Sequence, residues 1–82
     1  MAHITRRVHL TFPAEQIKEP VVYRLSKNYD VVTNIRRAAI EEDFGWMVLE
    51  ITGDSHAIDD GFKYLQGLGI QVDPVEGDIV EG

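Results

Sequence analysis

Two strand-like runs joined by a short turn constrain the fold of this chain more than any other feature. Residues 31–40 and residues 46–51 are both rich in β-branched and apolar side chains. The segment Asp43-Phe44-Gly45 between them is a turn signal, because glycine adopts positive φ without steric cost. A connection this short joins neighbouring strands only in antiparallel fashion. The two runs therefore predict a β-hairpin in the middle of the chain.

The segments on either side of the hairpin predict two helices and two further strands. Residues 5–12 alternate apolar and polar side chains, which is typical of a half-buried strand. Residues 20–29 place apolar side chains at helical spacing and begin with proline, which suits a first helical turn. A second helix is expected to begin at a cap on Asp54 or Ser55 and to end before Gly69, which fits the left-handed position just past a helix end. Residues 70–75 are expected to form a short last strand.

The resulting order, β-α-β-β-α-β, predicts an α+β fold of the ferredoxin-like kind. In that arrangement a four-stranded antiparallel sheet carries two helices on one face and leaves the other face uncovered. We expect a single domain over residues 1–75, followed by an acidic tail over residues 76–82. A chain of 82 residues has room for only a modest core, and self-association is a common supplement to such a core.

Composition disfavours several classes of function. The chain has no cysteine, so it holds no disulfide, no thiolate-bound cluster and no thiol nucleophile. Its formal net charge of −6 disfavours nucleic-acid binding. The histidines have no metal-ligand spacing, and no nucleophile–base motif is present. We therefore expect no enzyme activity, no metal and no cofactor. The first residues lack the apolar run of an export signal, and we expect a cytoplasmic protein without membrane insertion.

The third strand is apolar on both sides. A strand with one wet face alternates apolar and polar residues, but in residues 46–51 only Glu50 interrupts the apolar run. The helices cover one side of this strand. The other side needs a ligand or a second subunit, and a symmetric homodimer is the commonest closed assembly. The alternative is an ordinary exposed strand with scattered apolar side chains.

Asn34 is unusual inside the second strand, because asparagine is depleted in strands. Its amide offers a donor and an acceptor at one point, which suits the carboxylate and ammonium groups of an amino acid. The alternative is a local bond between this amide and neighbouring backbone.

The motifs around Asn34 resemble those of the NIL domain family. The segments that carry the resemblance are Thr33-Asn34-Ile35-Arg36-Arg37-Ala38, Gly45-Trp46-Met47-Val48-Leu49-Glu50-Ile51-Thr52-Gly53, Tyr64-Leu65-Gln66-Gly67-Leu68-Gly69-Ile70, Phe12-Pro13 and Glu19-Pro20-Val21-Val22. Together they cover nearly the whole chain, from Arg7 to about Val75.

The resemblance implies an ACT-like regulatory domain. The family occurs at the C-terminus of the ATPase subunit of methionine importers, where it implies a homodimer that binds methionine at the subunit interface. It also occurs fused to ferredoxin-type domains in proteins of sulfur metabolism. The expected function is therefore a regulatory module that binds methionine or a related sulfur amino acid. The alternative is a protein-interaction module that assists a separate ferredoxin or sulfur-metabolism enzyme.

The resemblance also implies the ligand-binding residues. Asn34 and Met47 match positions that the family uses near the amino acid, and the expected site lies around them on the face away from the helices. The third letter of the Asn-Ile-Leu signature is arginine here, and that arginine either pairs with a ligand carboxylate or fills the site. The full predicted set is Asn34, Ile35, Arg36, Trp46, Met47 and Val48.

Overall fold

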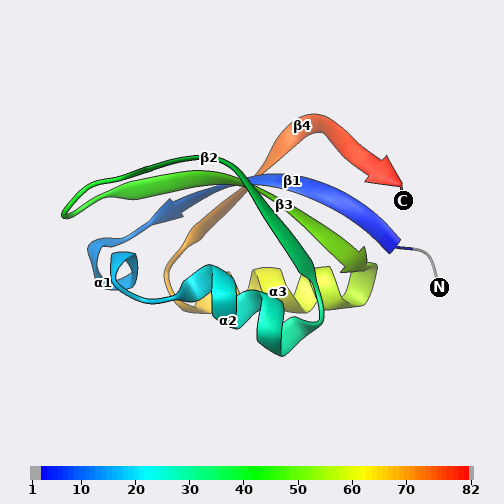
Figure 1. The fold of residues 1–82 in the computed structure, drawn as a ribbon, viewed down its shortest axis with the longest axis horizontal. Helices are drawn as coiled ribbons and strands as arrows, with labels where there is room; N and C mark the ends of the chain where they lie inside the picture. Colours follow the sequence, from blue (N-terminus) through cyan, green and yellow to red (C-terminus); the bar gives the residue numbers. More distant parts are fainter. Residues whose placement is uncertain (1–2, 82) are drawn as a thin grey trace.

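The computed structural model describes residues 3–81, and the side chains of residues 3–75. Along the chain its elements are β1 (His3–Phe12), α1 (Ala14–Ile17), α2 (Val21–Tyr29), β2 (Val32–Ile40), β3 (Gly45–Asp54), α3 (Ser55–Gly67) and β4 (Gln71–Glu81). The sheet forms one layer, and α2 and α3 form a second layer on one side of it (Figure 1).

The strands lie in the order β2-β3-β1-β4, and all three neighbouring pairs are antiparallel. The α+β class and the four-stranded antiparallel sheet are therefore confirmed, and the arrangement fits a ferredoxin-like fold. The predicted hairpin is β2 and β3, with Ile40 opposite Gly45 at its closed end.

Local sequence signals account for the ends of the helices. Pro20 occupies the N-cap position of α2, where its missing N–H leaves no donor unpaired. The side chain of Asp54 caps α3 by accepting a hydrogen bond from the backbone N–H of His56 at 3.1 Å. Gly69 follows α3 with φ of 82°, a left-handed conformation that glycine adopts without steric cost.

The core lies between the helices and the inner face of the sheet. The apolar positions of β1 and β3 point inward at every second residue, as the period-two pattern predicts. The buried apolar side chains are Val8, Leu10, Phe12, Val21, Leu25, Val31, Met47, Leu49, Ile51, Ile58, Leu65 and Ile70.

Three strands are longer than the sequence pattern indicates, and the short helix α1 was not expected. β1 begins at His3, β3 continues to Asp54, and β4 continues to Glu81 instead of ending at residue 75. The backbone of β4 pairs with β1 again beyond a register shift between Arg6 and Val8 of β1. β4 is an edge strand, where proline and bulges are tolerated, so Pro74 does not end it. The acidic side chains of the predicted tail lie outside the described residues.

An ion pair lies at the middle of the sheet face that turns away from the helices. Arg7 of β1 lies opposite Glu50 of β3. The Nε and Nη2 groups of Arg7 donate to Oε2 of Glu50 at 3.1 and 2.6 Å. The hydrogen bond from Arg7 holds the pKa of the Glu50 carboxyl below its ordinary value, because it stabilises the charged form. This face therefore has a charged centre.

We expect Glu50→Gln to make the protein less sensitive to acid. Because the pKa of Glu50 is lowered in the folded state, the ion pair contributes its stability above the unfolded pKa, about 4.3, and loses it as the pH falls through the folded pKa. Urea unfolding between about pH 6 and pH 3 should therefore show a steeper loss of unfolding free energy in the wild type than in Glu50→Gln. Glu15→Gln, at an exposed position of α1, serves as the control and should follow the wild type. Parallel curves for all three proteins would contradict the role of the pair.

We expect Gly61→Ala to destabilise the contact between α2 and α3. A Cβ at residue 61 would lie 2.8 Å from Cδ1 of Leu25, a side chain that is fully buried. Overpacking costs about 1–3 kcal/mol, which outweighs the gain of about 1 kcal/mol in helix propensity. Gly67→Ala is the matched control, since a Cβ there meets nothing within 4 Å. Urea unfolding should show a lower unfolding free energy for Gly61→Ala and an equal or higher one for Gly67→Ala.

Candidate functional site

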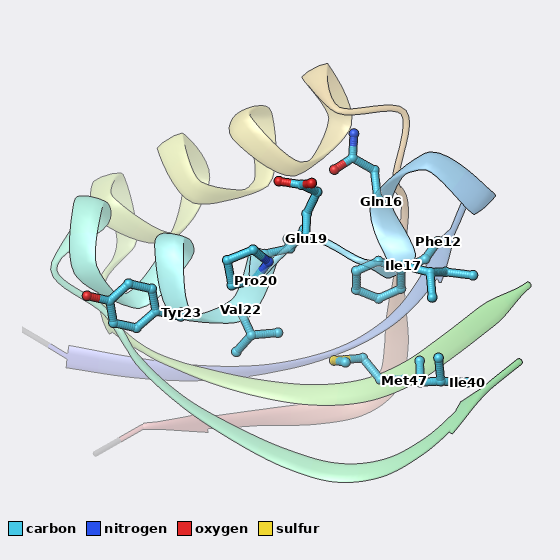
Figure 2. A pocket seen from close by; sticks show the side chains of 10 residues that line it. Phe12, Gln16, Ile17, Glu19, Pro20, Val22, Tyr23, Ile40 and Met47 are labelled. Carbon is cyan, nitrogen blue, oxygen red and sulfur yellow. The ribbon is translucent and has the colours of Figure 1, made fainter. Parts of the chain in front are cut away.

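A pocket lies between the helices and the margin of the sheet. Its volume is about 230 Å³. Figure 2 shows Val22 and Tyr23 of α2 on one side of it and Met47 and Ile40 of the two hairpin strands on the other. We call it the α2–β2 pocket. Its lining residues are Phe12, Gln16, Ile17, Glu19, Pro20, Val21, Val22, Tyr23, Ile40 and Met47.

The pocket exists because the helices cover β3 but leave the helix side of β2 open. Met47, on the inner face of β3, is only 8% exposed. Ile35 and Ile40 lie on the same side of the sheet in β2, yet they are 51% and 52% exposed. Gly45 lies opposite Ile40 in the register, and a Cβ there would lie 2.9 Å from Cδ1 of Ile40.

The lining is apolar on the side of the strands and more polar on the side of the helices. Gln16 and Glu19 point away from Met47 and Ile40 (Figure 2). The carboxylate of Glu19 accepts a hydrogen bond from Nη1 of Arg24 at 2.9 Å. Apolar walls with a few polar groups at one end are typical of sites that bind a small ligand by an apolar chain and a polar head.

The predicted ligand-binding residues do not form one cluster. Asn34 of β2 lies opposite Glu50 of β3 in the strand register. It therefore lies on the face away from the helices, together with Trp46 and Val48. Met47 lies on the helix side, because successive residues of a strand point to opposite faces. The expectation that Asn34 and Met47 share the face away from the helices is therefore wrong.

The other two predicted residues lie at an irregularity of β2. The register shifts between Ile35 and Arg37, which leaves Arg36 without a partner residue on β3. Ile35 points to the helix side, beside Leu49 in the register. The charge of Arg36 contributes to the lowered pKa of Glu50. Arg36 is thus near the polar centre of the uncovered face and not in the α2–β2 pocket.

The uncovered face is less apolar than the sequence of β3 indicates. The ring of Trp46 stacks on the ring of His9, with centroids 5.3 Å apart and planes 15° apart. Trp46 and Val48 are half-buried within this face. Thr5 and Thr52 share a hydrogen bond of 2.7 Å further along it. The apolar side of β3 is therefore partly covered by side chains of the same chain.

Sequence reasoning missed the residues that form the α2–β2 pocket apart from Met47. Ile17 lies on a helix of four residues, which is too short to give a periodic signal. Val22 and Ile40 belong to elements that were predicted, but their exposure depends on how α2 lies across the sheet. The apolar pair Val21-Val22 after Pro20 was the one available signal, since adjacent helical residues point about 100° apart. Val21 is buried, while Val22 packs only partly against the core.

Within the described residues, no group of three or more histidine, aspartate or glutamate side chains is arranged to hold a metal ion. No helix of that part of the chain has the length and hydropathy needed to cross a membrane.

Two curated relatives are similar in sequence. Both are methionine import ATP-binding proteins MetN, from two strains of Helicobacter pylori, and each is 28% identical over 71 residues. The match covers 82% of this chain but 22% of each relative, so the chain spans about a fifth of their length.

Solved structures support the fold. The C-terminal domain of an ABC transporter ATP-binding protein from Enterococcus faecalis is similar with a TM-score of 0.78 and 21% identity, over 89% of this chain and 86% of that one. A chain of AgrE in a complex with L-arginine is similar with a TM-score of 0.61 and 8% identity, over 92% of this chain and 12% of that one. The model of the NIL domain matches residues 6–74, and the chain therefore belongs to the NIL domain family.

Proposed function

We propose that this chain is a regulatory module that binds methionine or a related sulfur amino acid and works as a homodimer in the cytoplasm. The observation that carries the proposal is the family match over residues 6–74. The names of the curated relatives, which are methionine import proteins, support the choice of ligand. A regulatory role is compatible with the small size of the domain that matches the relatives. We propose no catalytic activity for this chain.

The α2–β2 pocket is the place that we propose for the ligand. Its volume of about 230 Å³ accommodates the unbranched chain of methionine. The thioether of the ligand would lie beside Met47 and the ring of Phe12, and sulfur–aromatic contacts are favourable. Gln16 and Glu19 offer acceptors for the ammonium group at the opposite side.

The face away from the helices is the competing place for the same ligand. Asn34 and Arg36 are the residues there with groups suited to an amino acid's carboxylate and ammonium. A ligand on this face would contact Trp46 and Val48 and would leave the pocket, with Met47, empty. The two places make opposite predictions for substitutions, because no residue lines both.

A second candidate function is a protein-interaction module that serves a ferredoxin or a sulfur-metabolism enzyme. The observation in its favour is the exposure of large apolar side chains along β2, where Val32 is 70% exposed. A partner protein would cover this strand without needing the α2–β2 pocket.

We expect L-methionine to bind the wild type in isothermal calorimetry and to raise its melting temperature. Val22→Phe should abolish the heat, because the larger ring fills the α2–β2 pocket. Val32→Phe adds the same ring at an exposed position and should leave the binding unchanged. Asn34→Ala should also bind normally if the ligand occupies the pocket.

Two results would count against this assignment. Loss of heat in Asn34→Ala, with normal binding by Val22→Phe, would place the ligand on the face away from the helices. No heat and no thermal shift with millimolar L-methionine or homocysteine would overturn the ligand-binding function and favour the interaction module.

A further inference from the structure

The bulge in β2 directs two consecutive arginines to one face of the sheet. The residues on either side of it, Ile35 and Ala38, lie opposite buried residues of β3 and therefore point to the helix side. Between them, Arg36 and Arg37 share one opposite residue, Val48, which points away from the helices. In a regular strand, one of two successive residues would point to the helices. The bulge instead brings both side chains to the uncovered face (Figure 1), and we call them the bulge arginines.

The bulge arginines are exposed, and within the described residues neither side chain has an ion pair or a hydrogen bond. The chain has 14 acidic residues, and two of its other arginines do use them, since Arg7 pairs with Glu50 and Arg24 with Glu19. The pKa of Glu50 is lowered by its hydrogen bond to Arg7 and further by the charge of Arg36, which agrees with a place on the same face. β2 itself has no acidic residue. Two positive charges are therefore left without a bonded anion.

Two adjacent guanidinium groups are suited to a single phosphate group. Arginine donates parallel N–H bonds to phosphate oxygens, and three oxygens can accept from two side chains at once. A phosphate monoester also carries about 1.5 to 2 negative charges at pH 7, which balances two cations. The carboxylate of a free amino acid carries one charge, which its own ammonium group offsets. The charge on this part of the face therefore favours a phosphorylated ligand.

The indole ring of Trp46 offers a stacking surface beside the bulge arginines. His9 of β1 stacks on the ring, so the side of the indole toward β1 is covered. On the side toward β2, the direct neighbour of Trp46 is Ala39 and the diagonal neighbour is Arg37. Ala39 ends in a single methyl group, and in the part of the chain that the structure describes no cation lies over the indole. The side of the ring toward β2 is therefore open to a planar group.

We propose that the uncovered face binds a nucleotide, with its phosphate between the bulge arginines and its base on the indole ring of Trp46. Diagonal neighbours on two strands lie about 7–8 Å apart, within reach of aromatic and long side chains, so one ligand can contact both. Every base has a π-face, so the stacking surface accepts any of them. This site goes beyond the proposed function and lies on the opposite side of the sheet from the α2–β2 pocket.

A single nucleotide suits this chain better than a nucleic acid. The formal net charge of −6 repels a long polyanion, and two arginines neutralise few of its phosphates. A mononucleotide places its whole charge at the bulge, where β2 has no acidic residue. The ligand class is therefore a small molecule with one planar ring and one phosphate-bearing end.

Titration with AMP tests the site, because Trp46 is the only tryptophan of the chain and its fluorescence reports on stacking. We expect AMP to quench this fluorescence to saturation. Its dissociation constant should be roughly tenfold or more below those of adenosine and inorganic phosphate, since each of these makes only part of the contacts. Equal dissociation constants for AMP and inorganic phosphate would overturn the nucleotide as the ligand class. No saturable quenching by millimolar AMP, GMP, CMP or UMP would overturn the site.

Two variants separate the phosphate from the base. We expect Arg36→Gln with Arg37→Gln to weaken AMP binding roughly tenfold or more and to leave adenosine unchanged. Ala39→Leu should lower the affinity for AMP to that for inorganic phosphate, because the larger side chain takes the place of the base beside the indole. Arg24→Gln with Lys27→Gln is the matched control, since it removes the same two charges from α2. An equal loss of AMP binding in this control would overturn the site, because it would show that only the total charge matters.

Titration with AMP at saturating L-methionine separates this site from the proposed amino-acid site. We expect the dissociation constant for AMP to stay within about twofold, because no residue of the α2–β2 pocket belongs to the nucleotide site. Displacement of AMP by L-methionine would overturn a separate nucleotide site and assign the uncovered face to the amino acid. Binding of AMP by a protein that gives no heat with L-methionine would support this site and overturn the proposed function.

Discussion

The antiparallel pairing of β1 with β3 supports the rest of the structure. These strands lie at the centre of the sheet, and their inward side chains, including Leu10 and Leu49, are fully buried against the helices. On the opposite face the same two strands are joined by the Arg7–Glu50 pair and the stack of His9 on Trp46. Side chains of the same chain thus cover both faces of this central strand pair. On one face they are buried apolar residues, and on the other they are side-chain pairs across the strands.

The margin of the sheet at β2 has no such cover. The helices extend over β3 but leave Ile35 and Ile40 of β2 half in solvent. The α2–β2 pocket and the exposed edge are two consequences of this one offset. A small domain buries only part of its apolar surface, and here the remainder is concentrated at one edge.

The outline of the fold was predictable from the sequence because its signals are local. Alternation in residues 5–12, the break between the two apolar runs of the hairpin and the glycine after α3 each depend only on neighbouring residues. The turn itself lies earlier than predicted, because Glu41 bonds to Phe44 and Gly45 already belongs to β3 without a positive φ. The ends of the strands were not predictable in the same way. β4 continues past Pro74 because β1 supplies a partner, and a partner strand is a long-range feature.

The sequence by itself determined the order of the four strands and the two longer helices, the hairpin and membership of the NIL domain family, because periodicity, turn residues and motif spacing are local features of the chain. Only the tertiary structure decided which face each candidate residue occupies. It separated Asn34 from Met47, since the register across β2 and β3 assigns them to opposite faces. It also decided that Ile35 and Ile40 of β2 remain exposed on the helix side of the sheet, because the position of α2 across the sheet depends on packing between distant segments.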